Sequence, residues 1–249
     1  MVGPTVSLSG LRRADGSASY KCPVTGYDVL GAVNAPVELP ARKDALRPED
    51  ATIEVFVKPG NTTAGVGEGY VESVLRSVLG SIVLGREKGF PRRGVVITLA
   101  IIGGEAVERG DSYLTILPAL LHASLLALIS AAVPLSMTFA TTLLAVTPSG
   151  QIVQDPPVED VANAVSLHVL AFSSKGHLLL NESQGRFDFE TWESVREQAA
   201  SICQGANPRG SDGDTAMDDE SKDGTLDNFI REAMEDHLHR VYSWKIESN

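Results

Sequence analysis

The longest apolar stretch of the chain runs from residue 112 to residue 133 and carries no charged side chain. From Thr115 onward it predicts a helix with apolar residues on every side, which is typical of a helix buried in a protein core. Pro118 and Pro134 bracket the stretch, His122 lies within it, and no cluster of Lys or Arg follows it. We therefore interpret it as a core helix rather than a membrane span, and expect the rest of the chain to wrap around it.

Shorter patterns on both sides of this stretch predict strands and amphipathic helices. Residues 52–58 alternate apolar and polar side chains, as a half-buried strand does. Residues 70–84 repeat apolar side chains at three- and four-residue spacing, which indicates an amphipathic helix. Residues 188–203 predict a helix with Asp188 as its N-cap. Further strands are predicted within 19–37 and at 95–102, 137–147, 151–154, 165–173 and 177–181, and a last helix at 226–244.

This order of elements predicts one α+β domain in which a sheet packs on helices, because no linker-like segment interrupts residues 5–204. Residues 204–225 are rich in Gly, Asp and Ser, and we expect them to form an acidic disordered insert. A solvated linker is the simpler interpretation of this insert, and a docking site for a basic partner is the alternative. Residues 226–249 then return to the same domain as a C-terminal helix.

Composition narrows the possible functions. The 249 residues are 43% hydrophobic, enough for a sizeable core. The net charge of −11 argues against a protein that coats nucleic acid, although acids at 211–223 supply part of it and a local basic surface remains possible. Cys22 and Cys203 form neither a disulfide framework nor a metal-ligand spacing, which favours an intracellular protein. The N-terminus has no secretory-signal pattern.

Motifs that carry known chemistry are missing from the sequence. It has no GxxxxGK[ST], GxGxxG, HExxH or CxxC pattern, and its five His do not group at a metal spacing, so we expect no cofactor and no metal. His122 and His168 lie in apolar segments, where a hydrogen-bonded core histidine is the simplest interpretation. Glu159 and Asp160 follow a turn and are interpreted as a solvated helix start. Together with Asp155 they are the alternative candidate for an unrecognised catalytic site.

A series of short motifs nevertheless resembles one known family. The motifs are DGSA at 15–18, Thr25, VLGAVNAPVEL at 29–39, FPR at 90–92, ALISAAVP at 127–134 and IVQDP at 152–156. Their order and spacing over roughly residues 8–203 resemble the RNase PH-like ring subunits of the eukaryotic RNA exosome. The short subunit that begins with DGS and does not degrade RNA is the most similar. The resemblance implies the α+β RNase PH fold (ribosomal protein S5 domain 2-like), with a mixed sheet packed on helices, over residues 1–203.

The same resemblance predicts that the chain has lost the family's activity. Active members use inorganic phosphate to release nucleoside diphosphates from the 3′ end of RNA, and hold the phosphate with a Thr/Ser-Arg pair at the start of the central helix. That pair falls on Ile116 and Leu117 here, and residues 110–185 contain no Arg. The family's two Asp, six residues apart, fall on Asp160 and Ser166. An apolar side chain in place of the Arg makes the site hostile to an anion.

We therefore expect a non-catalytic structural subunit of the exosome core ring that supports 3′–5′ processing and degradation of RNA. Its implied partners are other RNase PH-like subunits in a hetero-hexameric ring, RNA-binding cap subunits, RNA in the channel and, indirectly, a hydrolytic nuclease. The implied locations are the nucleus, the nucleolus and the cytoplasm. Arg42, Lys43 and Arg47 match a loop at the channel neck and are candidate RNA contacts, although ordinary surface charges are an equal interpretation. The alternative functions are an active phosphate-dependent 3′–5′ exoribonuclease and a self-assembling homo-oligomer.

Overall fold

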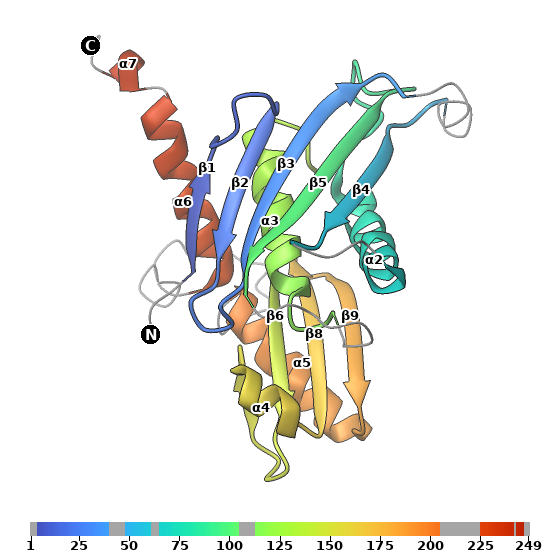
Figure 1. Cartoon of the computed structure of the whole chain (residues 1–249), viewed down its shortest axis with the longest axis vertical. Helices are drawn as coiled ribbons and strands as arrows, with labels where there is room; N and C mark the ends of the chain where they lie inside the picture. Colours follow the sequence, from blue (N-terminus) through green and yellow to red (C-terminus); the bar gives the residue numbers. More distant parts are fainter. Residues whose placement is uncertain are drawn as a thin grey trace, which may run out of the picture.

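The computed structural model describes residues 4–39, 48–60, 65–104, 113–204, 225–241 and 243–246. Its strands form two sheets, and one long helix, α3, packs against both of them (Figure 1). Arg42, Lys43 and Arg47, and nearly all of the acidic insert, lie outside the described residues.

The first sheet has five strands in the order β1-β2-β3-β5-β4. It is mixed, because β4 runs parallel to β5 while the other neighbours are antiparallel. The resemblance had implied a mixed sheet. β1 had no counterpart among the predictions, since four alternating residues are too short a signal to separate from a loop. The strands are β1 (Thr5–Leu8), β2 (Gly16–Lys21), β3 (Asp28–Val37), β4 (Thr52–Lys58) and β5 (Gly94–Gly103).

The second sheet has four antiparallel strands in the order β7-β6-β8-β9. β6 and β8 are buried along their whole length, so they are mostly apolar on both faces rather than alternating. β9 is longer than the predicted 177–181, because its polar second half also pairs with β8 at the sheet edge. The strands are β6 (Phe139–Val146), β7 (Ile152–Gln154), β8 (Ser166–Ser173) and β9 (Leu178–Gly185).

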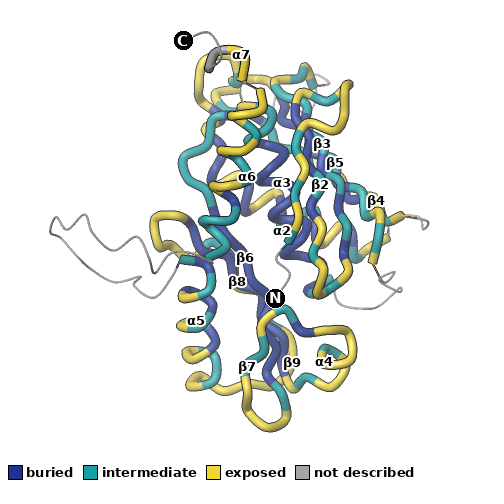
Figure 2. Tube along the Cα trace, turned by 90° about the vertical axis from the view of Figure 1, so that its left-hand side faces the viewer, coloured by how far each residue is buried: buried dark blue, intermediate teal, exposed yellow. Residues whose placement is uncertain are grey.

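Helices cover both sheets, and along the helices at the surface buried residues alternate with exposed ones (Figure 2). α2 packs on β4, while α5 packs on β6 and β8. Asp188 caps α5 as predicted, since its Oδ1 accepts a hydrogen bond of 2.8 Å from the Thr191 amide. The helices are α2 (Val66–Ile82), α3 (Leu117–Ser130), α4 (Val158–Asn163), α5 (Phe189–Gln204), α6 (Leu226–Val241) and α7 (Ser243–Ile246).

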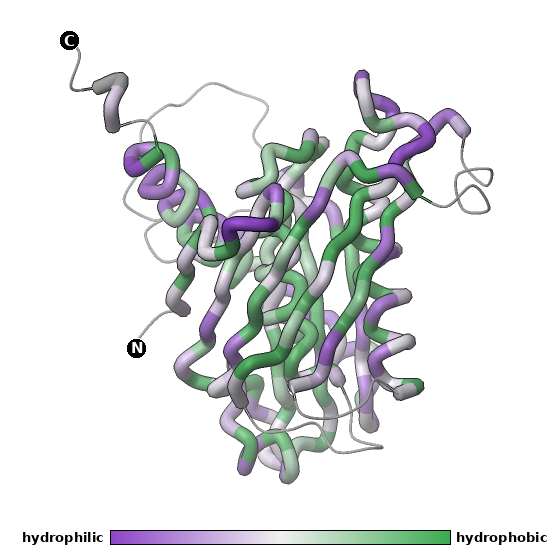
Figure 3. Tube along the Cα trace, turned by 45° about the horizontal axis from the view of Figure 1, so that its top comes forward, coloured by the Kyte–Doolittle hydropathy of each residue, from purple (hydrophilic) through white to green (hydrophobic). Residues whose placement is uncertain are grey.

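α3 is the helix predicted from the apolar stretch, and its first twelve residues, from Leu117 to Leu128, are buried. It begins two residues later than Thr115 and ends at Ser130. Ala132, two residues beyond this end, adopts a positive φ of 53° in the turn that follows. The length of α3 is therefore about 21 Å rather than the roughly 28 Å that the whole stretch would give. Green apolar segments gather along α3 and the central strands in Figure 3.

Two glycines of the family-like motifs allow α3 to lie directly on β2 and β3. A Cβ on Gly16 would come within 2.6 Å of the Ala127 carbonyl oxygen. A Cβ on Gly31 would come within 2.9 Å of the Ala123 carbonyl oxygen. Any larger residue would push α3 away from the sheet, so these two glycines set the short distance between α3 and strands β2 and β3.

β4 forms one edge of the first sheet, and a side chain of α2 partly covers this edge. The Val57 amide donates a hydrogen bond of 2.8 Å to Glu72 Oε1 on α2. A side chain thus occupies a backbone donor that would otherwise be available to another strand.

α6 joins the domain through Ile230, which lies in the shared core, and through contacts with α5 and β6. Within the described ranges, no helix combines the length and apolar character that crossing a membrane requires.

Candidate functional site

The start of α3 is the position at which the resemblance implies a phosphate site. Helix N-termini bind anions through amide groups that have no partner inside the helix. Here the Leu117 amide donates to the Tyr113 carbonyl oxygen at 3.1 Å, and the Leu120 amide donates to the Ile116 carbonyl oxygen at 3.1 Å. Pro118 has no amide hydrogen. The Leu120 bond is the ordinary first bond of the helix, so the Leu117 bond is the one that removes a free donor. Ile116 and Leu117 are also fully buried and Ala119 is 4% exposed, so little of this helix end is accessible to an anion.

A buried carboxylate lies beside the turn that leads into α3. Glu68, only 7% exposed, accepts a hydrogen bond of 2.7 Å from the Gly65 amide at the start of α2. Burial, followed by a hydrogen bond and charge interaction with Glu68, raises the pKa of the Tyr113 hydroxyl. The phenol therefore stays protonated and donates to Glu68. A carboxylate at this place repels phosphate rather than attracting it.

Ser166, at the position of the family's second Asp, belongs to a buried hydrogen-bond network. His168 lies between Ser166 Oγ, 2.9 Å from its Nε2, and Ser183 Oγ, 2.8 Å from its Nδ1. Ser183 and the Trp192 indole both donate to Asn181 Oδ1, so Ser183 accepts from the His168 Nδ1–H. Ser166 must then donate to His168 Nε2. Burial lowers the pKa of His168, which favours this neutral form.

The carboxylates near α4 do not gather into one site. Glu159 and Asp160 lie exposed in the first turn of α4, as the prediction of a solvated helix start required. Asp155 is more buried, and this burial raises its pKa despite hydrogen bonds from Gln154 and from the backbone. Within the described residues, no three His, Cys, Asp or Glu side chains come together in a way that could hold a metal ion.

His122 is a core histidine, as predicted. Its Nε2 accepts a hydrogen bond of 3.0 Å from the Thr141 amide, and its ring lies 5.1 Å from that of Tyr20. Burial lowers the pKa of His122 to about 4, so the ring is neutral at physiological pH.

The three degenerate family positions lie in three different settings. Leu117 is buried in α3, Asp160 is exposed on α4, and Ser166 is bonded to His168. No hydrogen bond or ion pair joins any two of these three described residues. Sequence reasoning missed Glu68 and Tyr113, whose only signal was a Glu three residues after Gly65, the spacing of a capping box.

Comparison with known proteins gives the family context of this arrangement. The chain is 29% identical over 202 residues to the exosome complex component RRP46 of Saccharomyces cerevisiae, covering 78% of this chain and 87% of that protein. The crystal structure of Rrp46 from rice (Oryza sativa) matches with a TM-score of 0.68 and 26% identity, over 80% of this chain and 88% of that one. This chain is a homologue of RNase PH-like exosome ring subunits. No family model matches it.

A more distant match supports the fold alone. The Archaeoglobus fulgidus exosome with RNA bound to its active site aligns with a TM-score of 0.60 at 12% identity, over 80% of this chain and 84% of that one. The predicted family resemblance and α+β RNase PH fold are thus confirmed.

Proposed function

We propose that this chain is a non-catalytic structural subunit of an RNA exosome core ring. The N-terminus of α3 carries the proposal: the Leu117 amide already has an acceptor, and the buried side chains of Ile116 and Leu117 stand where the family has its phosphate-binding pair. Removing one donor from a preorganised anion site typically costs about 3–4 kcal/mol at the transition state. Here Leu117 stands in place of the family's Arg, its amide is already bonded, and the nearby Glu68 carboxylate adds repulsion.

The homology to RRP46 supports the partners of such a subunit. It would complete a hetero-hexameric ring of RNase PH-like subunits, under RNA-binding cap subunits, and RNA would pass through the channel to a hydrolytic nuclease. It would support 3′–5′ RNA processing, including rRNA maturation, turnover and surveillance. Its places of action would be the nucleus, the nucleolus and the cytoplasm.

The proposed domain division follows the sequence. Residues 1–203 would form the RNase PH-like domain, 204–225 an acidic insert, and 226–249 a C-terminal part of the same domain. The packing of α6 on β6 and α5 supports this assignment of the C-terminal part.

The basic residues Arg42, Lys43 and Arg47 are the proposed contacts with RNA in the channel. Changing all three to Glu should weaken RNA protection by the assembled ring, because phosphate contacts depend on positive charge. Unchanged protection would remove these residues from the proposal.

The proposed function is tested by purifying the tagged chain from its own cells. Native mass spectrometry should find it with the other ring and cap subunits, while the recombinant chain alone should release no nucleoside diphosphates from RNA in phosphate buffer. A chain that purifies without such partners, or that is phosphorolytic by itself, would contradict the proposal.

A further inference from the structure

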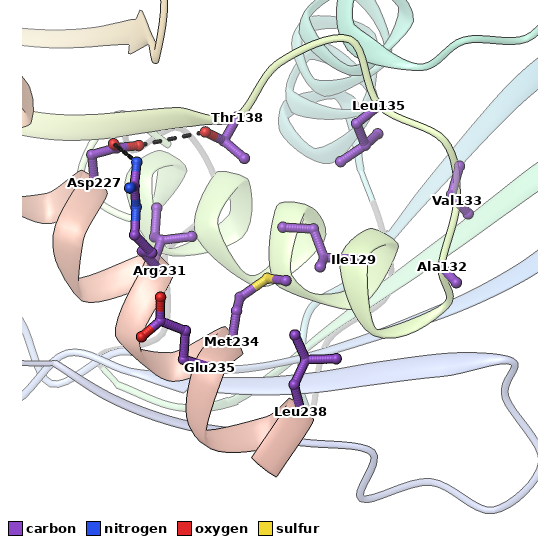
Figure 4. A pocket seen from close by; sticks show the side chains of 11 residues that line it. Ile129, Ala132, Val133, Leu135, Thr138, Asp227, Arg231, Met234, Glu235 and Leu238 are labelled. Carbon is purple, nitrogen blue, oxygen red and sulfur yellow. Dashed lines mark hydrogen bonds and ion pairs between the residues drawn. The ribbon is translucent and has the colours of Figure 1, made fainter. Parts of the chain in front are cut away.

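A groove of about 510 Å³ lies between the C-terminal end of α3 and α6, along α6 from Asp227 to Leu238 (Figure 4). We name it the α3–α6 groove. One apolar wall is formed by α3 and the turn after it, and the opposite wall is formed by α6. They are formed by Ile129, Val133, Leu135, Met234 and Leu238. A volume of this size accommodates several side chains or a small ligand.

The charged side chains that line the α3–α6 groove are two acids, Asp227 and Glu235, and one base, Arg231, so the lining is acidic by one charge. Asp227 is paired with Arg231 at 3.8 Å, while no ion pair with a described residue involves Glu235, which also lines the groove. α3 ends beside the groove, and helix C-termini carry partial negative charge. A phosphate-bearing occupant, whether RNA or lipid headgroup, is therefore disfavoured. A cationic group is favoured.

The apolar surface continues past the groove along α6. Met234, Leu238 and Val241 follow one another at helical spacing, so they share one stripe of the helix. Leu238 and Val241 remain 48% and 47% exposed. A single small molecule in the groove would leave this stripe uncovered, whereas a length of polypeptide could cover both.

We propose that the α3–α6 groove binds a segment of another protein that places an apolar side chain against Met234 and Leu238 and a Lys or Arg beside Glu235. Met234 suits such a role because its flexible thioether side chain adapts to different apolar partners. This interaction does not depend on the proposed function in RNA processing.

Site-specific photo-crosslinking in the organism's own cells tests this proposal. A benzoylphenylalanine at position 238 should give one dominant adduct, and mass spectrometry should map it to a segment of another protein that combines apolar residues with Lys or Arg. The same group at position 232, exposed on α6 but outside the groove, is the control. Glu235→Lys should lower the adduct yield roughly fivefold, and Glu232→Lys should change it less than twofold.

A synthetic peptide with the sequence of the crosslinked segment gives the direct measurement. Its Kd for the purified chain should rise by a similar factor, roughly fivefold, with Glu235→Lys and stay nearly constant with Glu232→Lys. Both variants lie on the exposed face of α6, and thermal unfolding verifies that they fold.

The proposal is overturned by an adduct at position 238 no stronger than that at 232, or by one that is insensitive to Glu235→Lys. An adduct to this chain itself, to a second copy or to lipid also overturns it. The subunit composition of the same purified sample reports separately on the proposed function. Ring subunits without the adduct contradict only the groove, and the adduct without ring subunits contradicts only the ring.

Discussion

The two ends of α3 differ in almost every physical property. At the N-terminal end, the Leu117 amide is bonded to Tyr113, Ile116 and Leu117 are fully buried, and a buried carboxylate lies nearby. At the C-terminal end, the helix stops in a turn and its apolar side chains line an open groove. The end where active relatives are expected to hold phosphate is thus closed here. The open end belongs to a part of the molecule to which the resemblance assigns no chemistry.

This difference suggests how an enzyme fold can serve as a scaffold. Under the proposed function, apolar side chains in place of an anion site would stabilise the centre of the domain, because hydrophobic burial would replace a desolvated charge. Surfaces at the periphery then remain available for contacts with other proteins. The following changes test how strongly the two ends differ.

Leu117→Arg should have the largest effect, because it places a cation in a closed apolar site without a designed partner. We expect a loss of about 3–5 kcal/mol in the free energy of unfolding, measured by urea denaturation. Phosphate-dependent release of nucleoside diphosphates should stay absent, also when Ser166→Asp is added. Leu238→Arg, at the open end, is the matched control and should cost less than about 1 kcal/mol. A stable, phosphorolytic Leu117→Arg protein would disprove the closed-site interpretation.

Leu120→Ala should be the next largest, since Leu120 is fully buried in the first half of α3. Truncating such a side chain removes its burial and leaves a cavity, at a cost of about 3 kcal/mol. Leu238→Ala should cost less than about 1 kcal/mol, because Leu238 is already half exposed. Equal losses from the two changes, in the same denaturation experiment, would show that the groove wall is packed as tightly as the core.

His122 should make stability depend on pH. Its pKa is lowered by burial from 6.5 to about 4, so below pH 6.5 the unfolded chain binds a proton that the folded chain excludes. Stability should therefore fall as the pH drops from about 6.5 to about 4, by about 2–3 kcal/mol from this group. His122→Gln should flatten the stability profile over this range, whatever its stability at neutral pH. An unchanged slope would assign the effect to other groups.

Tyr113→Phe should have the smallest effect of the four. It removes the hydroxyl that donates to Glu68 and leaves the carboxylate without that donor. We expect a loss of about 1 kcal/mol, measured by thermal unfolding at neutral pH. Tyr70→Phe, which removes an exposed hydrogen bond to Glu182, is the control and should cost less. No loss in Tyr113→Phe would mean that water replaces the hydroxyl at this helix end.

The sequence predicted most elements of the fold because their patterns are local. The uniform apolar character of α3, the alternation in β4 and the capping role of Asp188 all correspond to observed structure. The predicted degenerate positions Leu117 and Ser166 lie on α3 and β8, and their assignment to a family site stays a prediction. The second half of β9 could not be predicted, because its pairing with β8 rather than its own polar sequence makes it a strand.

The closure of the α3 N-terminus was only partly predictable. The missing Arg was visible in the sequence, but the consumption of the Leu117 amide by Tyr113 depends on backbone geometry. The approach of Glu68 to Tyr113 joins α2 to the turn before α3, two segments about forty-five residues apart in the sequence. The α3–α6 groove combines residues about a hundred positions apart, which no local pattern relates. Such features arise from tertiary packing.

The hydrogen bond between Glu72 and the Val57 amide affects how the chain behaves between its synthesis and its assembly with partners. A ring subunit is synthesised alone and must not pair with identical copies through its sheet edges while it waits for partners. With one donor of β4 already occupied, a foreign strand would have to displace Glu72 before completing its ladder. The Glu72 carboxylate on α2 thereby disfavours pairing of β4 with a second chain before assembly.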